Sequence, residues 1–506
     1  MEKLIERLRK QGVFISLDGD ELKVNFNTDS LPSSLLSEIK ASKTELRQFL
    51  KRSGVSKKFL AIPTIKVEND LELSSAQRRL WILSQNKACS VAYNLPRQLL
   101  LNGFFNVKNF RRAIISTIER HEILRTVFKE NESGEVKQWI LERKNLGFEL
   151  DYIDFRDEVN KVQIYIEEDS NKAFDLEQGP LFRASLLHIG EESYIFYYNM
   201  HHIISDGWST TVLSKDVLSY YNAYNEDREP ELEELRIQYK DYSAWQLSQL
   251  KEESYQNHKD YWLTQLSGDI ELLDLPASRL RPKVKSFNGR TLTTYINDDL
   301  YQKLKSYSHH NKGTLFMGLV SSLKVLLYKY TSKQDVIIGT PTAGRGHSDL
   351  ENQIGFYINT LALRNKISPQ DSFNVVFSNV SRTILDAYVH QMYPFDKVVE
   401  ELNLSRSSSR SAIFDVIIVL QNNKVTTDEV SVSENQLDEI LESRSGTSIY
   451  DIKFDFQEQG DYLKFSIEYN TDIYEERMIK GLMRHYKQLL ASLLEDTDKL
   501  VGEIDY

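Results

Sequence analysis

Strand-like runs alternate with amphipathic helical stretches along the chain from residue 71 onward. The runs YIFYYNM, DVIIGT, FDVIIVLQN and LKFSIEYN are rich in the β-branched and aromatic residues that favour strands. In NFRRAIISTIERHEIL and ERMIKGLMRHYKQLLASLL the apolar residues recur every three or four positions, which is typical of a helix with one buried face. This mixture predicts an α/β (α+β) protein and argues against a helical bundle or a β-sandwich. The chain has 506 residues and is too long for one core, so we expect two or three packing units.

Composition narrows the functional classes. The formal net charge of −11 argues against general nucleic-acid binding, because phosphate contacts need a basic surface. No uninterrupted apolar run approaches the roughly 20 residues that cross a bilayer, and the N-terminus MEKLIERLRKQG is charged. We therefore expect a cytoplasmic protein with no membrane partner. The single cysteine, Cys89, can form neither an internal disulfide nor a cysteine metal cluster, and we expect it to be inert.

The first fifty residues have the turn and capping signals of a small separate unit. KLIERLRKQG predicts a helix that ends at Gly12. VFISLDGDELKVNF predicts two alternating strands joined at Asp18-Gly19, because the positive φ angles of a tight hairpin turn favour Asn, Asp or Gly. A β-hairpin is therefore expected directly after the first helix.

Two further helices are expected after the hairpin. One has Pro32 in its first turn, and the other starts with the capping box Ser42-x-x-Glu45. Residues 1–52 are thus predicted to form an αββαα unit, and the irregular segment 53–70 a linker. So small a unit buries too little apolar area to be robust alone, so we expect it to pair with itself or with a partner.

The segment MHHIISDGWS (200–209) contains the strongest chemical signal, two adjacent histidines followed by an Asp-Gly pair. Successive strand residues point to opposite faces, so only one of His201 and His202 can face a given site. No third ligand stands at a metal-like spacing, and no metal is expected. An isolated histidine is usually a core residue, but Asp206-Gly207 predicts a tight turn that exposes backbone N–H groups beside an imidazole. Such a site can accept a proton and stabilise an oxyanion.

Several segments, in the same order, resemble the motifs of condensation domains of nonribosomal peptide synthetases, which belong with the chloramphenicol acetyltransferase-like acyltransferases. HHIISDGWS resembles the family signature His-His-x-x-x-Asp-Gly. The other matching segments are SSAQRRLWIL (74–83), RHEILRTVF (120–128), YKDYSAWQ (239–246), IGFYINTLALR (354–364), HQMYPFDKVVEEL (390–402) and RSSSRSAIFDVIIVLQN (406–422). The resemblance spans residues 70–506. The first fifty residues, with SLDGDELKV and IKASKTELRQFL, resemble a tubulysin-type N-terminal docking domain.

The resemblance implies a fold and a domain organisation. Two chloramphenicol acetyltransferase-like lobes would form a V-shaped pseudodimer with the active site where they meet. We expect the N-lobe at 71–240 and the C-lobe at 241–506, after the docking domain at 1–52 and the linker at 53–70. A tunnel would open on two faces, one for each carrier protein.

The implied reaction is amide formation. The amine of an aminoacyl thioester on an acceptor carrier would attack the peptidyl or aminoacyl thioester on a donor carrier. Both substrates would be held on 4'-phosphopantetheine arms of the carriers, with no cofactor bound in this chain. The segments MHHIISDGWS and AYNLP resemble the corresponding segments of domains that accept an L-configured donor, with the D-accepting type as the alternative. Two alternatives for the whole chain are a coenzyme A-dependent acyltransferase and a non-catalytic scaffold that only orders carriers.

The resemblance also assigns roles around the signature. His202 would be the catalytic imidazole, and Gly207 would present its N–H near the thioester. His201 would be structural. Asp206 would pair with an arginine, for which Arg345 is our choice, with Arg125 and Arg364 as alternatives.

Two further groups of residues are predicted by the resemblance. Asn359 and Ser209 are candidates for substrate binding, although loop stabilisation explains Asn359 equally well. An upstream synthetase subunit would dock its C-terminal tail on the hairpin edge, and the local excess of basic residues favours an acidic tail. The docking candidates are Lys3, Arg7, Lys10, Phe14, Lys23 and Val24.

Overall fold

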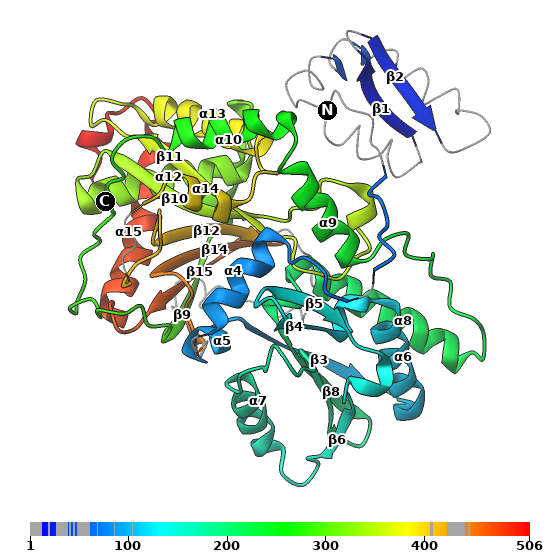
Figure 1. Cartoon of the computed structure of the whole chain (residues 1–506). Coiled ribbons are helices and arrows are strands. Elements are labelled where there is room, and N and C mark those ends of the chain that lie inside the picture. Colours follow the sequence, from blue (N-terminus) through cyan, green and yellow to red (C-terminus); the bar gives the residue numbers. More distant parts are fainter. Residues whose placement is uncertain are drawn as a thin grey trace. The chain divides into compact units, whose positions relative to one another are not determined.

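The computed structural model describes two compact units, Met1–Ile62 and Pro63–Tyr506 (Figure 1). In the first sixty residues it describes only 13–18, 21–26, 39, 42, 43, 46 and 47. From residue 61 to 505 it describes all residues except 68, 86, 104, 405–407, 422–440 and 444–445.

The first unit contains the predicted hairpin. Strands β1 (Val13–Asp18) and β2 (Glu21–Phe26) pair antiparallel, with Asp18 opposite Glu21 across the turn. The prediction of a hairpin is therefore confirmed, and its short connection agrees with the Asp-Gly signal.

Three of the docking candidates lie on these strands. Phe14 is on β1, whereas Lys23 and Val24 are on β2, opposite Ser16 and Ile15. The other candidates, Lys3, Arg7 and Lys10, lie outside the described residues, as do most residues of the three predicted helices.

The second unit begins with a lobe built on a four-stranded sheet. The strands, in sheet order, are β3 (Asn94–Asn102), β8 (Ser193–His201), β7 (Phe182–Gly190) and β6 (Leu150–Asp154). Helix α6 (Val107–Arg120) packs against α8 (Gly207–Asn225), and Phe110 of α6 contacts Phe196 of β8. Helix α7 (Val162–Ser170) packs on the other face of the sheet, against Tyr197. Strand β8 is therefore buried on both faces.

Smaller elements complete this lobe. The further helices and strands are α4 (Ser75–Ser84), α5 (Lys87–Ala92), β4 (Thr126–Glu130) and β5 (Val136–Ile140). Single 3-10 turns lie at Glu122–Arg125, Arg143–Asn145, Val159–Lys161 and His202–Ile204. Because the first of these turns begins after His121, α6 ends before the HEIL residues that its periodicity had included.

The second lobe is built on a seven-stranded mixed sheet. In sheet order its strands are β11 (Asn359–Lys366), β10 (Asp335–Thr342), β12 (Val416–Gln421), β14 (Ile452–Gln459), β15 (Tyr462–Asn470), β9 (Gly289–Ile296) and β13 (Leu441–Ser443). Its helices are α10 (Glu253–Gln265), α11 (Asp298–His310), α12 (Leu315–Thr331), α13 (Phe373–Val389), α14 (Phe395–Glu401) and α15 (Glu476–Glu495), with 3-10 turns at Ser348–Leu350 and Val501–Glu503.

Side-chain alternation explains why this sheet has one apolar and one polar face. Ile452, Phe454 and Phe456 of β14 have no exposed area and belong to the main core, where Phe456 packs against Tyr486 of α15. Lys453, between them, points to the opposite face because successive strand residues alternate. The helices thus cover one face and leave a polar face on the other side.

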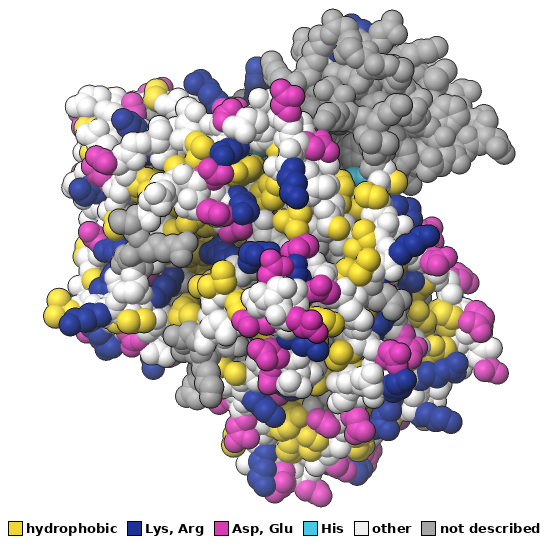
Figure 2. Space-filling model, in the orientation of Figure 1, with side chains coloured by type: hydrophobic (Ala, Val, Ile, Leu, Met, Phe, Trp, Pro, Cys, Tyr) yellow, Lys and Arg dark blue, Asp and Glu magenta, His cyan; other side chains and the backbone are white. Residues whose placement is uncertain are grey.

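The observed elements confirm the predicted mixed α/β class. The division predicted at 240/241 falls inside α9 (Tyr239–Gln249) and stays a prediction. No helix in the described part of the chain is long and apolar enough to cross a membrane. On the face drawn in Figure 2, acidic and basic side chains are interspersed.

Candidate active site

The two histidines lie where β8 leads into α8. His201 is the last residue of β8, His202 opens a 3-10 turn, and α8 begins at Gly207. Asp206 is the N-cap of that helix, and its carboxylate accepts a hydrogen bond from Ser209 N at 2.8 Å. The predicted tight turn at Asp206-Gly207 is therefore wrong. Asp is a preferred N-cap residue, so the pair starts a helix, whose first N–H groups have no partner within the helix.

His202 has a defined tautomer. Its Nδ1 lies 2.6 Å from the carbonyl oxygen of Ser205. A carbonyl oxygen only accepts, so Nδ1 carries the proton and Nε2 keeps a lone pair. The ring packs edge-on against Phe356, with centroids 4.8 Å apart. Burial lowers the pKa of His202 below its usual value, although the Ser205 carbonyl and Asp206 act in the opposite direction. The imidazole is therefore neutral and able to accept a proton at neutral pH.

His201 has a different environment. It has no exposed area, and its Nδ1 accepts the N–H of Ile203 at 3.2 Å. Its ring contacts Tyr93 and, edge-on, Phe174. Burial lowers the pKa of His201 to about 3. These contacts support the structural role expected for this residue.

Gly207 lies at an open position in the first turn of α8. A Cβ atom built on it would meet no heavy atom within 4 Å. Among the residues that the structure describes, none accepts a hydrogen bond from its N–H, which is at the positive end of the helix dipole. This N–H is available to a bound oxygen.

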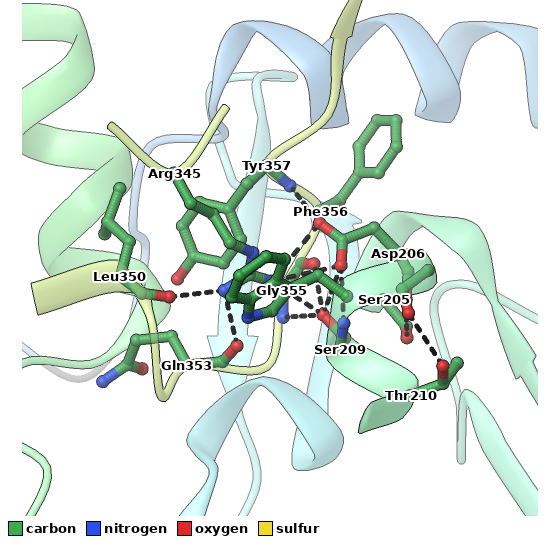
Figure 3. A network of polar contacts seen from close by, with 12 residues as sticks. Ser205, Asp206, Ser209, Thr210, Arg345, Leu350, Gln353, Gly355, Phe356 and Tyr357 are labelled. Atoms are coloured by element: carbon green, nitrogen blue, oxygen red, sulfur yellow. Dashed lines mark hydrogen bonds and ion pairs between the residues drawn. The ribbon is translucent and has the colours of Figure 1, made fainter. Parts of the chain in front are cut away.

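The carboxylate of Asp206 is the centre of a buried polar network (Figure 3). Arg345 Nη2 lies 3.1 Å from Asp206 Oδ1, and the two side chains are 2% and 1% exposed. The carboxylate also accepts the hydroxyl of Ser209 at 2.7 Å and the N–H of Tyr357 at 3.1 Å. The expected pair of Asp206 and Arg345 is thus present, 139 residues apart in sequence.

Further contacts fix the guanidinium of Arg345. It donates to the carbonyl oxygens of Leu350 and Gln353, the latter at 2.7 Å, and it lies over the ring of Tyr357 at 4.1 Å. The two alternatives have other partners. Arg125 donates to the carbonyl of Leu141 at 2.8 Å, and Arg364 pairs with Asp335 at 2.6 Å.

The two substrate-binding candidates are held by the protein itself. Ser209 has no exposed area, and its hydroxyl contacts Asp206, Arg345 and Gly355. This geometry places Ser209 in the ion-pair network, and its substrate contact stays a prediction.

Asn359 is the other substrate-binding candidate. Its amide donates to the carbonyls of Gln391 and Tyr393 and accepts the N–H of Phe395. These bonds support the loop-stabilising interpretation. Asn359 also lines a small pocket together with Tyr242, Trp245, Tyr357 and Asp396.

Sequence reasoning missed Phe356 and the carbonyl of Ser205. The first buries the imidazole of His202, and the second fixes its tautomer. Ser205 lies inside the signature itself, so the contact of its carbonyl with His202 could have been predicted from the motif. Contact between residues 202 and 356 depends on packing between the lobes, for which no local pattern exists.

Two protein families match the chain. The condensation domain matches residues 67–506, and the TubC N-terminal docking domain matches residues 1–52. The chain therefore belongs to the condensation-domain family, with a docking domain at its N-terminus. The predicted class, the amide-forming acyltransferases of nonribosomal peptide synthetases, is confirmed at the level of the family.

Curated relatives are much longer synthetase proteins. One of the linear gramicidin synthase proteins of Brevibacillus parabrevis is 35% identical over 492 residues, which cover 95% of this chain and 10% of that protein. Bacitracin synthase 1 of Bacillus licheniformis is 35% identical over 435 residues, 86% of this chain and 8% of that protein. The chain thus spans about a tenth of the length of these relatives.

Solved structures share the fold. The X-domain from teicoplanin biosynthesis has a TM-score of 0.78 at 22% identity, over 88% of this chain and all of that one. A four-domain nonribosomal peptide synthetase bound to AMP and glycine has a TM-score of 0.75 at 21% identity, over 87% of this chain and 34% of that one. The predicted fold class is confirmed by these likenesses.

Proposed function

We propose that this chain forms an amide bond between a donor and an acceptor thioester, both presented by carrier proteins. The observation that carries the proposal is the tautomer of His202, whose Nδ1 donates to the Ser205 carbonyl and leaves Nε2 as an acceptor. An amine attacks only in its neutral form and must lose a proton as the amide forms. In this proposal, Nε2 of His202 accepts or orients that proton.

Gly207 supplies the second part of the proposed mechanism. Attack on the thioester carbonyl creates a tetrahedral oxyanion, which backbone N–H groups at a helix N-terminus stabilise. The open space at the Cβ position of Gly207 leaves room for the thioester. As the tetrahedral intermediate collapses, the carbon–sulfur bond breaks and the donor arm leaves as a thiol. Asp206 and Arg345 hold the start of α8, which positions this N–H.

The substrates in this proposal are acyl groups on 4'-phosphopantetheine arms of a donor and an acceptor carrier. We infer from the sequence of the histidine motif that the donor is L-configured, with a D-configured donor as the alternative. The unit at 1–52 docks the C-terminal tail of an upstream synthetase subunit. Its family match and its hairpin support this, because an extended tail can pair with a strand edge.

A carrier assay tests the catalytic proposal. The acceptor carrier's intact mass is followed after mixing with a loaded donor carrier, in separate arms with L- and D-donors and with a coenzyme A thioester. His202→Ala is expected to slow transfer by about 10²–10⁴-fold, the range of a general acid–base group. The exposed His309→Ala is the matched control. Wild-type rates for His202→Ala would contradict the role, and efficient use of the coenzyme A thioester would contradict carrier delivery.

A truncation tests the docking proposal. Deleting residues 1–52 is expected to slow transfer from a donor carrier on its native upstream subunit, because the local concentration falls. Transfer from a donor carrier fused to the protein should be unchanged. If the deletion slows transfer equally from the native upstream subunit and from the fused carrier, and also lowers the melting temperature, this unit only stabilises the condensation domain.

A further inference from the structure

The buried hydroxyl of Tyr239 links the segment that covers His202 to helix α4 of the first lobe. Tyr239 is the first residue of α9 and is only 1% exposed. Its hydroxyl lies 2.6 Å from the carbonyl oxygen of Phe356 and 2.9 Å from Oγ of Ser74. A carbonyl oxygen only accepts, so the proton of Tyr239 points to Phe356 and the tyrosine oxygen accepts from Ser74. Three segments that are distant in sequence thus meet at one hydroxyl.

Both ends of this hydrogen-bond chain are well defined. Ser74 is the N-cap of α4, where its Oγ accepts the N–H of Gln77 at 3.2 Å and its own N–H donates to Gln77 Oε1 at 3.1 Å. These capping bonds leave the hydroxyl proton of Ser74 for Tyr239. Burial raises the pKa of Tyr239 well above its usual value, so this hydroxyl keeps the proton that it donates to Phe356.

The same tyrosine also supports the backbone beside Phe356. A Cβ atom built on Gly355 would lie 2.1 Å from the ring of Tyr239, so the segment runs directly over that ring. Within the described part of the chain, Tyr239 is the only hydrogen-bond donor to the carbonyl of Phe356. The ring and the hydroxyl of one residue therefore fix where the main chain of Phe356 lies.

The position of Phe356 matters because its ring covers the imidazole of His202, with centroids 4.8 Å apart. Burial is the largest cause of the lowered pKa of His202, so this ring helps to keep the imidazole neutral. The next residue, Tyr357, has its own bond to the start of α8, since its N–H donates to Asp206 (Figure 3). Loss of the hydroxyl of Tyr239 should therefore leave the segment attached and loosen only Phe356.

We propose that Tyr239 is a positioning residue for the condensation reaction, and that its hydroxyl sets how closely the ring of Phe356 covers the imidazole of His202. The catalytic consequence rests on the proposed function, whereas the environment of His202 can be measured without any substrate. The inference also gives a role to the segment YKDYSAWQ, which begins at Tyr239.

The substitution Tyr239→Phe tests the inference because it keeps the ring and removes only the hydroxyl. A looser Phe356 lets water reach the imidazole, so the pKa of His202 should rise towards its usual value. The titration is followed by NMR of the full chain with isotope-labelled histidine, and the signal of His202 is the one that His202→Ala lacks. The other titratable or charged groups that act on His202 are unchanged in this variant, namely Tyr93, His201, Asp206 and Arg97.

The rate of transfer between carriers provides a second readout. A higher pKa leaves a larger fraction of His202 protonated at a given pH, so fewer molecules have a free Nε2. The acid limb of the pH–rate profile of Tyr239→Phe should therefore move to higher pH, with a loss of about ten-fold in rate on the limb for each pH unit of that movement. Above the limb the variant should recover most of the wild-type rate.

Tyr242→Phe is the matched control, three residues further along α9. Tyr242 is buried, and its hydroxyl accepts from Gln246 Nε2 of the same helix at 3.0 Å. This variant should leave the titration of His202 unchanged. In a Phe356→Leu background, Tyr239→Phe should cause no further change in that titration, because the tyrosine acts only through the ring of Phe356.

Two results would overturn the inference. One is a Tyr239→Phe protein that is less stable but titrates His202 as the wild type does, because the hydroxyl would then be purely structural. The other is an equal shift in Tyr242→Phe, which would reflect a general loosening of α9. A shift in Tyr239→Phe alone, in a protein that transfers no acyl group, would support the positioning and contradict the proposed function, so the two are judged separately.

Discussion

Removing the carboxylate of Asp206 should destabilise the protein strongly. In Asp206→Ala the guanidinium of Arg345 loses its ionic partner in a buried site, which typically costs about 3–5 kcal/mol. The change also removes the helix cap, about 1 kcal/mol, and leaves the N–H of Tyr357 unsatisfied, about 1–3 kcal/mol. Arg345 keeps Ser209 and two carbonyl oxygens as partners, so these costs overlap. We expect a loss of about 5 kcal/mol in unfolding free energy, towards the low end of the sum.

A double-mutant cycle separates the ion pair from the cap. Asn is as good an N-cap as Asp, so Asp206→Asn keeps the cap and removes the charge. We expect Asp206→Asn and Arg345→Met each to cost about 3 kcal/mol, because each leaves one buried charge without its partner. The double variant removes both charges and should cost about 4 kcal/mol, measured by denaturant unfolding of the full chain. Costs that add within about 0.5 kcal/mol would refute the energetic coupling of the pair.

Two other substitutions are informative. Gly207→Ala should fold normally, because its Cβ meets no atom within 4 Å, but should slow condensation by about 10- to 100-fold if the methyl group occupies space that the thioester needs. Gly481→Ala, equally open on α15, should be fully active, and equal activities of the two variants would argue against a substrate at Gly207. Lys324 is fully buried and donates to the carbonyls of Val336 and Leu363, and burial lowers its pKa to about 7. The folded state therefore binds fewer protons than the unfolded state between pH 7 and about 10.4. The unfolding free energy of the wild type minus that of Lys324→Met should rise with pH in this range, by up to about 1.4 kcal/mol per pH unit, and should be flat below pH 7. A difference that falls with rising pH would refute this reasoning.

Much of the fold could be predicted because alternation and helical periodicity encode which side of an element is buried. The runs around β8, β10, β12 and β15 and the apolar stripe of α15 were all found in this way. The start of α8 was not, because Asp-Gly is a signal for a turn as well as for a helix N-terminus. The periodic apolar residues after Trp208, together with Ser209 three positions after Asp206, could have distinguished the two.

The site was less predictable than the fold because its contacts join distant segments. The resemblance to a family led to Arg345, but nothing local to that residue indicates a partner 139 positions away. The surroundings of Ser209 were unpredictable for a related reason. Its place beside the signature suggested substrate contact, whereas packing between the lobes buries its hydroxyl among Asp206, Arg345 and Gly355.

One short segment of the C-lobe sets the chemistry of the histidine in the other lobe. Gly355 has no room for a side chain, since a Cβ would lie 2.1 Å from the ring of Tyr239, and this close approach seats the segment on the N-lobe. Phe356 then contacts the ring of His202. Tyr357 contacts a different partner, because its N–H donates to the carboxylate of Asp206 (Figure 3). The aromatic contact contributes to the burial that keeps the imidazole neutral, and the N–H helps hold the cap that positions Gly207. The state of His202 therefore depends on both lobes, which explains why the residues that control it lie far from its signature in sequence.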